Sequence, residues 1–351
     1  MRHAKAPIAI ALAALLILGG TIAALAFDGS SKPEVRGAPQ AVQSAHLIAA
    51  AAPAPSGTAC AAQTAAVVAK VDGEVAERIY SAELRSSAVT AGRQQIAGNG
   101  PLISAMRSGS RAAVQTAVHA LVYSGTHIVR LRVSRGSRLL ADVGGPYIIA
   151  PVTGTLRDRG RAIGRFSFSV QDDLGYIKLV TRFIAVPLVL RTPKGQVPVE
   201  GQAAGAPARI PARGPVSYHG ATFEAYSFTA QAFPKGTLRV SLLSPPRSGL
   251  SRLSCAQVRA DESARIATHV ARRFSLGPTT LPTYAGLVSK LTLARVIIKA
   301  GGRTYMAGGG SAPRRLPSSG TVTLGGKRYA VATVQLPTSV GTARASVLLP
   351  G

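Results

Sequence analysis

HIVRLRVSRGSRLLADVGG (residues 127–145) and PVTGTLRDRGRAIGRFSFSVQDD (residues 151–173) are the stretches that decide the fold of this chain. Apolar and polar side chains alternate in both with a period of two, which is typical of strands that bury one face. Turn-forming residues interrupt the alternation at residues 135–137 and 172–175. The pattern predicts two antiparallel hairpins, and residues 176–183 are expected to form the returning strand of the second hairpin.

Helices are predicted before this region, and further strands are predicted after it. Apolar residues recur at steps of three and four from Val68 to Ile79, which predicts an amphipathic helix over residues 61–86. Two shorter helices are predicted over residues 101–107 and 111–122, separated by a Ser-Gly-Ser turn. Further strands are predicted downstream at residues 186–190, 196–199, 221–229 and 238–243.

The chain also repeats itself. Cys60-Ala61 and Cys255-Ala256 each precede a similar segment by the same spacing, VAERI at residues 75–79 and VARRF at residues 270–274. Other short matches follow in the same order: glycine pairs at 144–145 and 309–310, residues 154–156 with 320–322, and residues 169–171 with 333–335. We therefore expect a second copy, with a helix over 257–274 and strands over 293–299, 303–307, 327–335 and 344–349. Residues 216–245 also resemble residues 322–350, so the hairpin unit is expected three times and the helical unit twice.

The order of long helix, short helices, strand, glycine turn, strand, loop and two long strands resembles Cache domains, the PAS-like extracellular sensor modules of bacterial receptors. Residues 127–173 carry most of the resemblance. It implies an α+β fold of two tandem units, each with a leading helix followed by an antiparallel sheet and a small-molecule pocket. We expect the first unit, with an additional hairpin unit, over 60–250 and a smaller repeat over 251–351. Receptors of this type continue into an output domain, whereas this chain ends at Gly351, so binding without its own output domain is expected.

The N-terminus predicts export. A short basic region precedes an apolar run over residues 8–26, and Ala24-Leu25-Ala26 fits a signal-peptidase site. Residues 1–27 are therefore either a cleaved signal peptide or a retained membrane anchor. Residues 28–59 are rich in Ala and Pro and predict a linker. Both alternatives place the rest of the chain outside the cytoplasm, secreted or anchored to the cytoplasmic membrane.

The charge and the cysteine content limit the ligand classes and the compartment that fit this chain. The chain carries 41 Lys and Arg against 14 Asp and Glu, a formal net charge of +27, and its last acidic residue is Glu262. Such a charge attracts anionic ligands or envelope polyanions; export and the few aromatic residues argue against nucleic acid. In an oxidising compartment Cys60 and Cys255 are expected to form a disulfide between the two leading helices, or to remain as two free thiols.

Candidate ligand-binding residues lie on the polar faces of the predicted strands. They are Arg130, Arg132, Arg165, Ser167 and Ser169, with Tyr147 in the loop after the paired glycines. Guanidinium groups bind a carboxylate through two hydrogen bonds, and hydroxyls orient it. Arg295 is expected at the position of Arg130 in the second copy. The same alternation also fits a solvent-exposed sheet face.

No hydrolase, nucleotide-binding or metal-site motif occurs in the sequence, so no catalytic residue, metal or cofactor is predicted. We expect a non-enzymatic, sensor-like protein that binds a small anionic ligand, with a separate partner to carry any signal. One alternative is a basic interaction protein that binds the anionic cell envelope. A hydrolase is the weaker alternative, because nothing in the chain assembles a nucleophile and a base.

Overall fold

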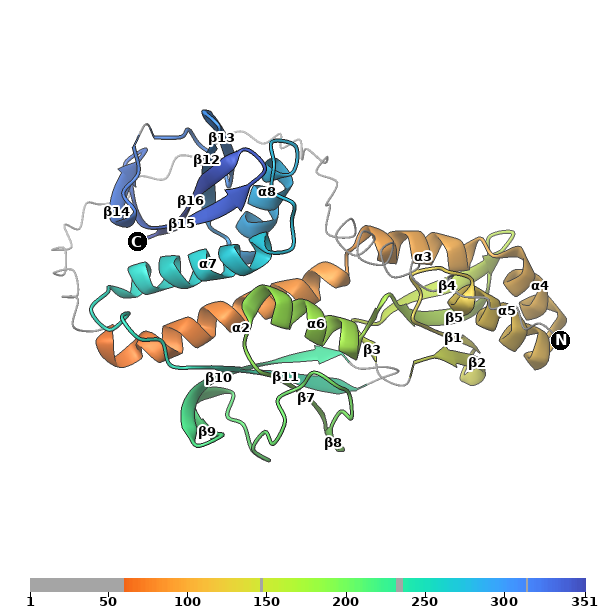
Figure 1. The fold of residues 1–351 in the computed structure, drawn as a ribbon. Helices are drawn as coiled ribbons and strands as arrows, with labels where there is room; N and C mark the ends of the chain where they lie inside the picture. Colours follow the sequence, from red (N-terminus) through yellow and green to blue (C-terminus); the bar gives the residue numbers. More distant parts are fainter. Residues whose placement is uncertain (1–59, 146–147, 232–235, 314) are drawn as a thin grey trace, which may run out of the picture.

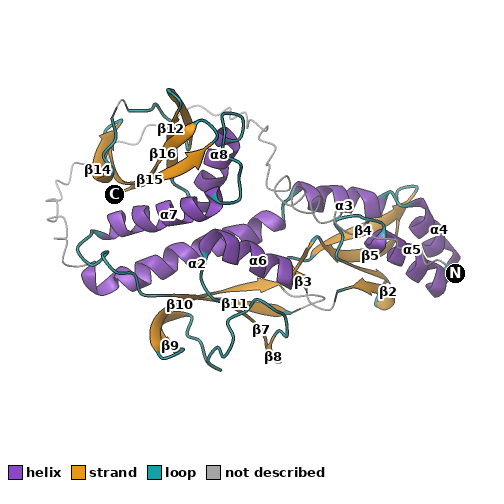
Figure 2. Cartoon of the chain, viewed as in Figure 1, coloured by secondary structure: helices purple, strands orange, loops and turns teal. Residues whose placement is uncertain are grey.

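The computed structural model describes residues 60–145, 148–231, 236–313 and 315–351. The expected signal or anchor segment, the expected linker and Tyr147 lie outside the described residues. Within these ranges, no helix combines the length and apolar character needed to cross a membrane. Helices alternate with antiparallel sheets along the chain (Figures 1 and 2), so the expected α+β fold is confirmed.

The helices agree in part with the predicted ones. They are α2 (Thr64–Glu83), α3 (Ser87–Ala97), α4 (Gly100–Ser108), α5 (Arg111–Tyr123), α6 (Asp173–Ile184), α7 (Cys255–Ala271) and α8 (Leu281–Thr292). The strands are β1 (Arg130–Arg135), β2 (Arg138–Gly144), β3 (Ile148–Ile149), β4 (Val152–Asp158), β5 (Arg161–Ser169), β6 (Gln171–Asp172), β7 (Leu188–Thr192), β8 (Gly195–Gln196), β9 (Arg213–Tyr218), β10 (Ala221–Gln231), β11 (Thr237–Ser244), β12 (Arg295–Ala300), β13 (Arg303–Ala307), β14 (Ser319–Leu324), β15 (Lys327–Thr338) and β16 (Gly341–Pro350).

Three sheets share one strand order. The first sheet is β2-β1-β5-β4, the second is β8-β7-β11-β10-β9 and the third is β13-β12-β16-β15-β14. Counted within each sheet, the second and third have the order 2-1-5-4-3, which is the order of a PAS-like sheet. The first sheet has the same order without a third strand. The two five-stranded sheets form the tandem units, whereas the repeat predicted the first sheet as the counterpart of the third and the strands of the second sheet as an additional hairpin unit.

Helices fill the space between the second and third sheets. α2 and α6 pack on the second sheet, α7 and α8 pack on the third, and α2 lies along α7 (Figure 1). The inward-facing apolar residues of all these elements form one buried cluster. Tyr176 and Tyr284 are fully buried in it, and their hydroxyls donate to Ala76 O and Ala267 O at 2.9 Å. Each five-stranded sheet therefore has its own leading helix, α2 or α7.

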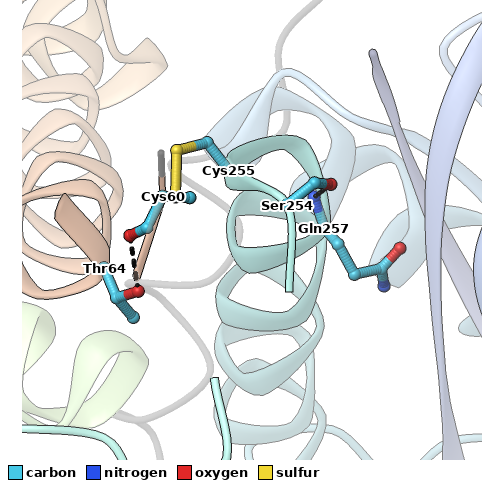
Figure 3. Close-up of a disulfide and its surroundings, with 5 residues drawn as sticks. All are labelled: Cys60, Thr64, Ser254, Cys255 and Gln257. Atoms are coloured by element: carbon cyan, nitrogen blue, oxygen red, sulfur yellow. Dashed lines mark hydrogen bonds between the residues drawn. A yellow bond between two sulfur atoms is a disulfide. The ribbon is translucent and has the colours of Figure 1, made fainter. Parts of the chain in front are cut away.

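A disulfide joins the starts of the two leading helices (Figure 3). Cys60 and Cys255 are bonded, with their Cα atoms 5.2 Å apart, across 195 positions of sequence. The Thr64 hydroxyl donates to Cys60 O at 2.9 Å, and Ser254 caps α7 by accepting from Gln257 N at 3.2 Å. The predicted pairing is confirmed, and it ties the two units together at one end of the helical layer.

The first sheet forms a separate lobe within the chain, between α2 and α6 (Figure 2). Helices α3, α4 and α5 pack on its inner face, where Leu131 and Phe168 are fully buried. This lobe has its own apolar cluster, distinct from the one between the other two sheets. Residues 216–245, expected as an additional hairpin unit, are β9, β10 and β11 of the second sheet.

One predicted strand was wrong. Residues 176–183 lie in α6, a helix whose first turn is capped by the Asp172 carboxylate accepting from Gly175 N at 2.6 Å. Tyr176, Ile177, Val180 and Ile184 recur at helical spacing and are buried. The many β-branched and aromatic residues favour a strand locally, but the capped start and the buried stripe outweigh that propensity. Helices α3 and α8 were not predicted.

Parts of the repeat alignment also need correction. Residues 154–156 lie in β4 and residues 320–322 in β14, which are the fourth and third strands of their sheets. Gly144 faces Arg130, while the residue that faces Arg295 in the same close approach is Gly308, one position before the predicted glycine pair. A Cβ at either glycine would come within 3 Å of the opposing Cα. In contrast, the match of 216–245 with 322–350 is confirmed strand by strand.

Candidate functional site

The register of β1 and β5 places the predicted residues on one face of the first sheet. Arg130 lies opposite Ser169, Arg132 opposite Ser167, and Ser134 opposite Arg165. The inner face of these strands is packed against helices, so this polar face points away from the lobe's core. We call it the polar face of the first sheet.

A hollow of about 1160 Å³ lies over this face. Its polar lining comprises Arg93, Arg132, Ser134, Ser137, Thr153, Thr155, Arg165, Ser167 and Gln231. Three of these side chains are guanidinium groups, and none is a carboxylate. Gln231 belongs to the end of β10, so the second sheet borders the hollow on one side.

Arg130 shares the face but has a different role. Its Nε and Nη2 donate to the two carboxylate oxygens of Asp142 at 2.8 and 2.9 Å, and its Nη1 donates to Gly145 O at 2.9 Å. Arg132 Nε lies 3.7 Å from the same carboxylate. Asp142 thus pairs with Arg130 in a bidentate geometry and holds Arg132 beside it, which orients Arg132 along the floor of the hollow.

Ser169 does not line the hollow. It is fully buried, its Oγ lies 2.6 Å from Ile149 O, and the same Oγ accepts from Gln171 N at 3.1 Å. The hydroxyl therefore holds β3 and β6 against the end of β5. Its predicted role as a ligand contact is not supported by this geometry, and Tyr147 lies outside the described residues.

The sequence analysis missed six polar lining residues, which are Arg93, Ser134, Ser137, Thr153, Thr155 and Gln231. Thr153 and Thr155 lie on β4 opposite Ser167 and Arg165. Their alternation in VTGTL would have predicted them as lining residues if the pairing of β4 with β5 had been known. Arg93 comes from α3, which was not predicted, and no local signal connects it with the strands. Four of the six predicted residues share the polar face without being buried in it: Arg130, Arg132, Arg165 and Ser167.

The arrangement suits anion binding. Guanidinium groups at Arg93, Arg132 and Arg165 present planar donor pairs, and the hydroxyls of Thr153, Thr155 and Ser167 add single donors on adjacent strands. Among the described residues, no group of three or more His, Cys, Asp or Glu side chains gathers to hold a metal. Nor do the lining residues include a histidine or carboxylate to activate one of the hydroxyls.

Two buried acids mark the junctions of the lobe. Glu83 ends α2 and Asp173 begins α6, and burial raises the pKa of each carboxyl to about 7, with the Asp172 charge contributing at Asp173. Asp173 Oδ1 has no hydrogen-bond partner among the described residues. The Asp172-Asp173 pair, expected as a turn, thus caps and begins a helix, outside the hollow.

Known proteins offer few matches to this chain. No protein family matches the sequence, and no curated protein matches it. A search of solved structures finds the periplasmic domain of LuxQ from Vibrio cholerae, at 12% sequence identity and a TM-score of 0.32, covering 53% of this chain and all of that one. The strand order within the chain itself defines the PAS-like α+β fold.

Proposed function

We propose that this chain is an extracytoplasmic, sensor-like protein of the Cache type, which binds an anionic ligand on the polar face of its first sheet. The observation that carries the proposal is the hollow over that face. Arg93, Arg132 and Arg165 surround it, and no carboxylate lines it. The nearby Asp142 is engaged by Arg130 in a bidentate pair, so its charge is largely matched.

A carboxylate ligand would be held in two ways. Arg165 is exposed and has the rotational freedom to form two parallel hydrogen bonds with a carboxylate. The hydroxyls of Thr153 and Ser167, which lie opposite each other, would donate to a second oxygen group of the ligand. Binding is therefore expected to depend on charge and on the spacing between the two groups.

The disulfide supports the extracytoplasmic location in this proposal. A bond between Cys60 and Cys255 persists in an oxidising environment and is rare in the cytosol. This agrees with the export signal expected in residues 1–27. A separate protein would carry the signal inward in this proposal.

A second candidate function is attachment to the anionic envelope. From residue 263 to residue 351 the chain has twelve Lys or Arg and no acidic residue. A surface of this kind binds polyanions without a defined pocket, and such binding weakens steeply with salt.

A thermal-shift screen of the full chain separates the two. Small carboxylates, inorganic phosphate and a polyanion would be tested at low and high salt. A ligand that binds the folded state raises the midpoint by mass action. We expect a small carboxylate to raise it at both salt concentrations and to lose this effect in Arg165→Ala, while Arg303→Ala, an exposed arginine on β13, leaves it unchanged. A shift with the polyanion alone, and only at low salt, would contradict the proposed site.

A further inference from the structure

The polar face of the first sheet has two counterparts in the same chain. The fifth strand of each sheet carries an Arg-x-Ser sequence whose Arg and Ser point to the face away from the helices: Arg165 and Ser167, Arg239 and Ser241, Arg344 and Ser346. A hydroxyl residue of the fourth strand lies opposite each serine: Thr153, Ser227 and Thr333. The three faces are therefore equivalent by register.

In the second and third sheets, a segment of the chain itself covers this face. The two segments, which we call straps, are residues 206–212 and 312–318, between the second and third strands of their sheets; residue 314 lies outside the described residues. With the two residues that follow, they read APARIPARG and APRRLPSSG, identical at five of nine positions. Two prolines in each restrict the backbone to an extended conformation.

The equivalent hydroxyl residues hold both straps in the same way. Ser227 Oγ donates to Pro211 O at 3.1 Å, and Thr333 Oγ1 donates to Pro317 O at 3.2 Å. The backbone N–H of Ser227 and of Thr333 also donates to the next carbonyl of its strap, at 2.9 and 2.8 Å. In the second sheet, Arg239 Nη2 donates to Ile210 O at 2.9 Å.

Each strap also inserts an apolar side chain into the face. Ile210 packs in a cluster with Val189 and Leu243, and Leu316 packs against Ile297 and Leu348. Val189 and Ile297 belong to the first strands of their sheets. They lie opposite Ser241 and Ser346, the equivalent serines of the fifth strands. The apolar side chain of the strap thus fills a pocket between the first and fifth strands.

The first sheet differs at these positions. Arg132 lies where the other sheets have Val189 and Ile297, and Ser169 lies where they have Leu243 and Leu348. Only residues 145–151 connect β2 to β4, and β3 within them pairs with β6. The described part of this connection contains no proline-rich strap. Ile149 O of β3 accepts from Ser169 Oγ at one end of the face, and the rest of the face is the hollow lined by Arg93, Arg132 and Arg165.

We infer that the first sheet binds an extended, proline-containing segment of another polypeptide, with an acidic side chain where the straps have Ile210 and Leu316. This inference rests on the proposed function and names the class of its ligand. Thr153 is placed to donate to a backbone carbonyl as Ser227 and Thr333 do. Arg132 and Arg165 would pair with the acidic side chain, whose charge complements the face.

Isothermal titration of the full chain with designed peptides tests this. The probe is Ac-APAAEPASG-NH2, a strap sequence with Glu at the inserted position, and its matched control is Ac-APAAIPASG-NH2. We expect the Glu peptide to bind and the Ile peptide to bind at least about tenfold more weakly, as for loss of a charge-assisted hydrogen bond. Citrate serves as the small-carboxylate comparison.

Two variants sharpen the result. Arg132→Ile places in the first sheet the residue that the third sheet has, and it should reverse the preference toward the Ile peptide. Arg344→Ala removes the equivalent arginine of the third sheet, where Leu316 of the strap already occupies the position of the inserted side chain, and it should leave binding of the Glu peptide unchanged. Thermal midpoints of both variants verify that they fold.

Three outcomes would overturn the inference. If citrate binds through Arg165 and neither peptide binds, the proposed function stands and the peptide class is wrong. If none of the three binds, both proposals fail. If the peptides do not bind and the chain self-associates in light scattering in a manner lost in Arg132→Ile, the face belongs to a second copy.

Discussion

The first sheet and the two strapped sheets share a strand order and a register of polar residues, yet the polar groups on that face meet different partners. In the second sheet, Arg239 and Ser227 donate to carbonyls of the strap, and in the third sheet Thr333 does so. In the first sheet, the corresponding donors line a hollow. Because buried or half-buried donors require acceptors, the comparison indicates that the open face is the one available to a ligand.

The comparison extends to the interior. The strapped sheets share one large core with four helices between them, whereas the first sheet has a smaller core of its own. Stability and binding are therefore expected to separate, with stability residing mainly in the shared core and binding in the lobe. The following predictions test that separation, from the largest expected effect to the smallest.

Arg265→Met should cause the largest loss of stability. Arg265 donates to Asp72 Oδ1 at 2.9 Å and pairs with Glu262, and both carboxylates are fully buried between α2 and α7. Removing the guanidinium leaves the two buried carboxylates with the more distant Arg247, 3.8 Å from Glu262, as their remaining cation among the described residues, at a cost of about 3–5 kcal/mol in the free energy of unfolding. Denaturant unfolding measures it. Arg130→Met breaks a pair in the lobe whose side chains are 17% and 23% exposed, and it should cost less, about 1–2 kcal/mol; equal losses would contradict the separation.

Replacing both cysteines by alanine should cause the second largest loss of stability. The disulfide closes a loop of 195 positions and joins the leading helices of the two strapped units. Its loss should lower the free energy of unfolding by about 2–4 kcal/mol. Ligand affinity at the first sheet, measured by calorimetry well below the new midpoint, should not change. A matching loss of affinity would show that the lobe depends on how the two units are joined.

Stability should fall as the pH rises from 4 to 8. The pKa values of Glu83 and Asp173 are raised to about 7 in the folded chain by burial, so the folded state binds more protons than the unfolded state in this range. The two protonated carboxyls contribute their full stabilisation below the ordinary carboxyl pKa. This contribution is lost as the pH rises through about 7. Glu83→Gln should remove about 2–3 kcal/mol of this dependence. Unfolding curves at pH 4, 6 and 8 measure the slope, and an unchanged slope would contradict the assignment.

Ile210→Ala should have the smallest effect. Ile210 is the buried side chain of the strap on the second sheet. Its truncation should lower the free energy of unfolding by about 2 kcal/mol, at the low end for a core position because the strap can settle into the space. Hydrogen exchange of the Ser227 amide, which donates to Ala212 O, should speed up if the strap loosens. Unchanged exchange would indicate that the hydrogen bonds alone hold the strap.

Local patterns predicted a good part of this architecture. Stripes of apolar residues located α2 and α7. Alternation placed Arg132 on the polar face of one strand and Arg165 and Ser167 on the polar face of another, and the register brings these faces together. The cysteines at equivalent helix starts predicted the disulfide. The strand predicted over residues 176–183 is wrong because a run of β-branched and aromatic residues fits both a strand and a helix. Only the Asp172 cap and the burial of one stripe distinguish the helix from the strand.

The sequence by itself determined the α+β class, the two leading helices, the disulfide and the polar side of each strand, because these follow from periods of two and 3.6 residues and from covalent chemistry. Only the tertiary structure decided which strands pair, that the first sheet forms a lobe between α2 and α6, and which polar faces are covered. The strap repeat is visible in the printed sequence, but its meaning depends on hydrogen bonds between distant segments. Alternation assigns a side chain to a face, and only long-range packing determines what that face meets.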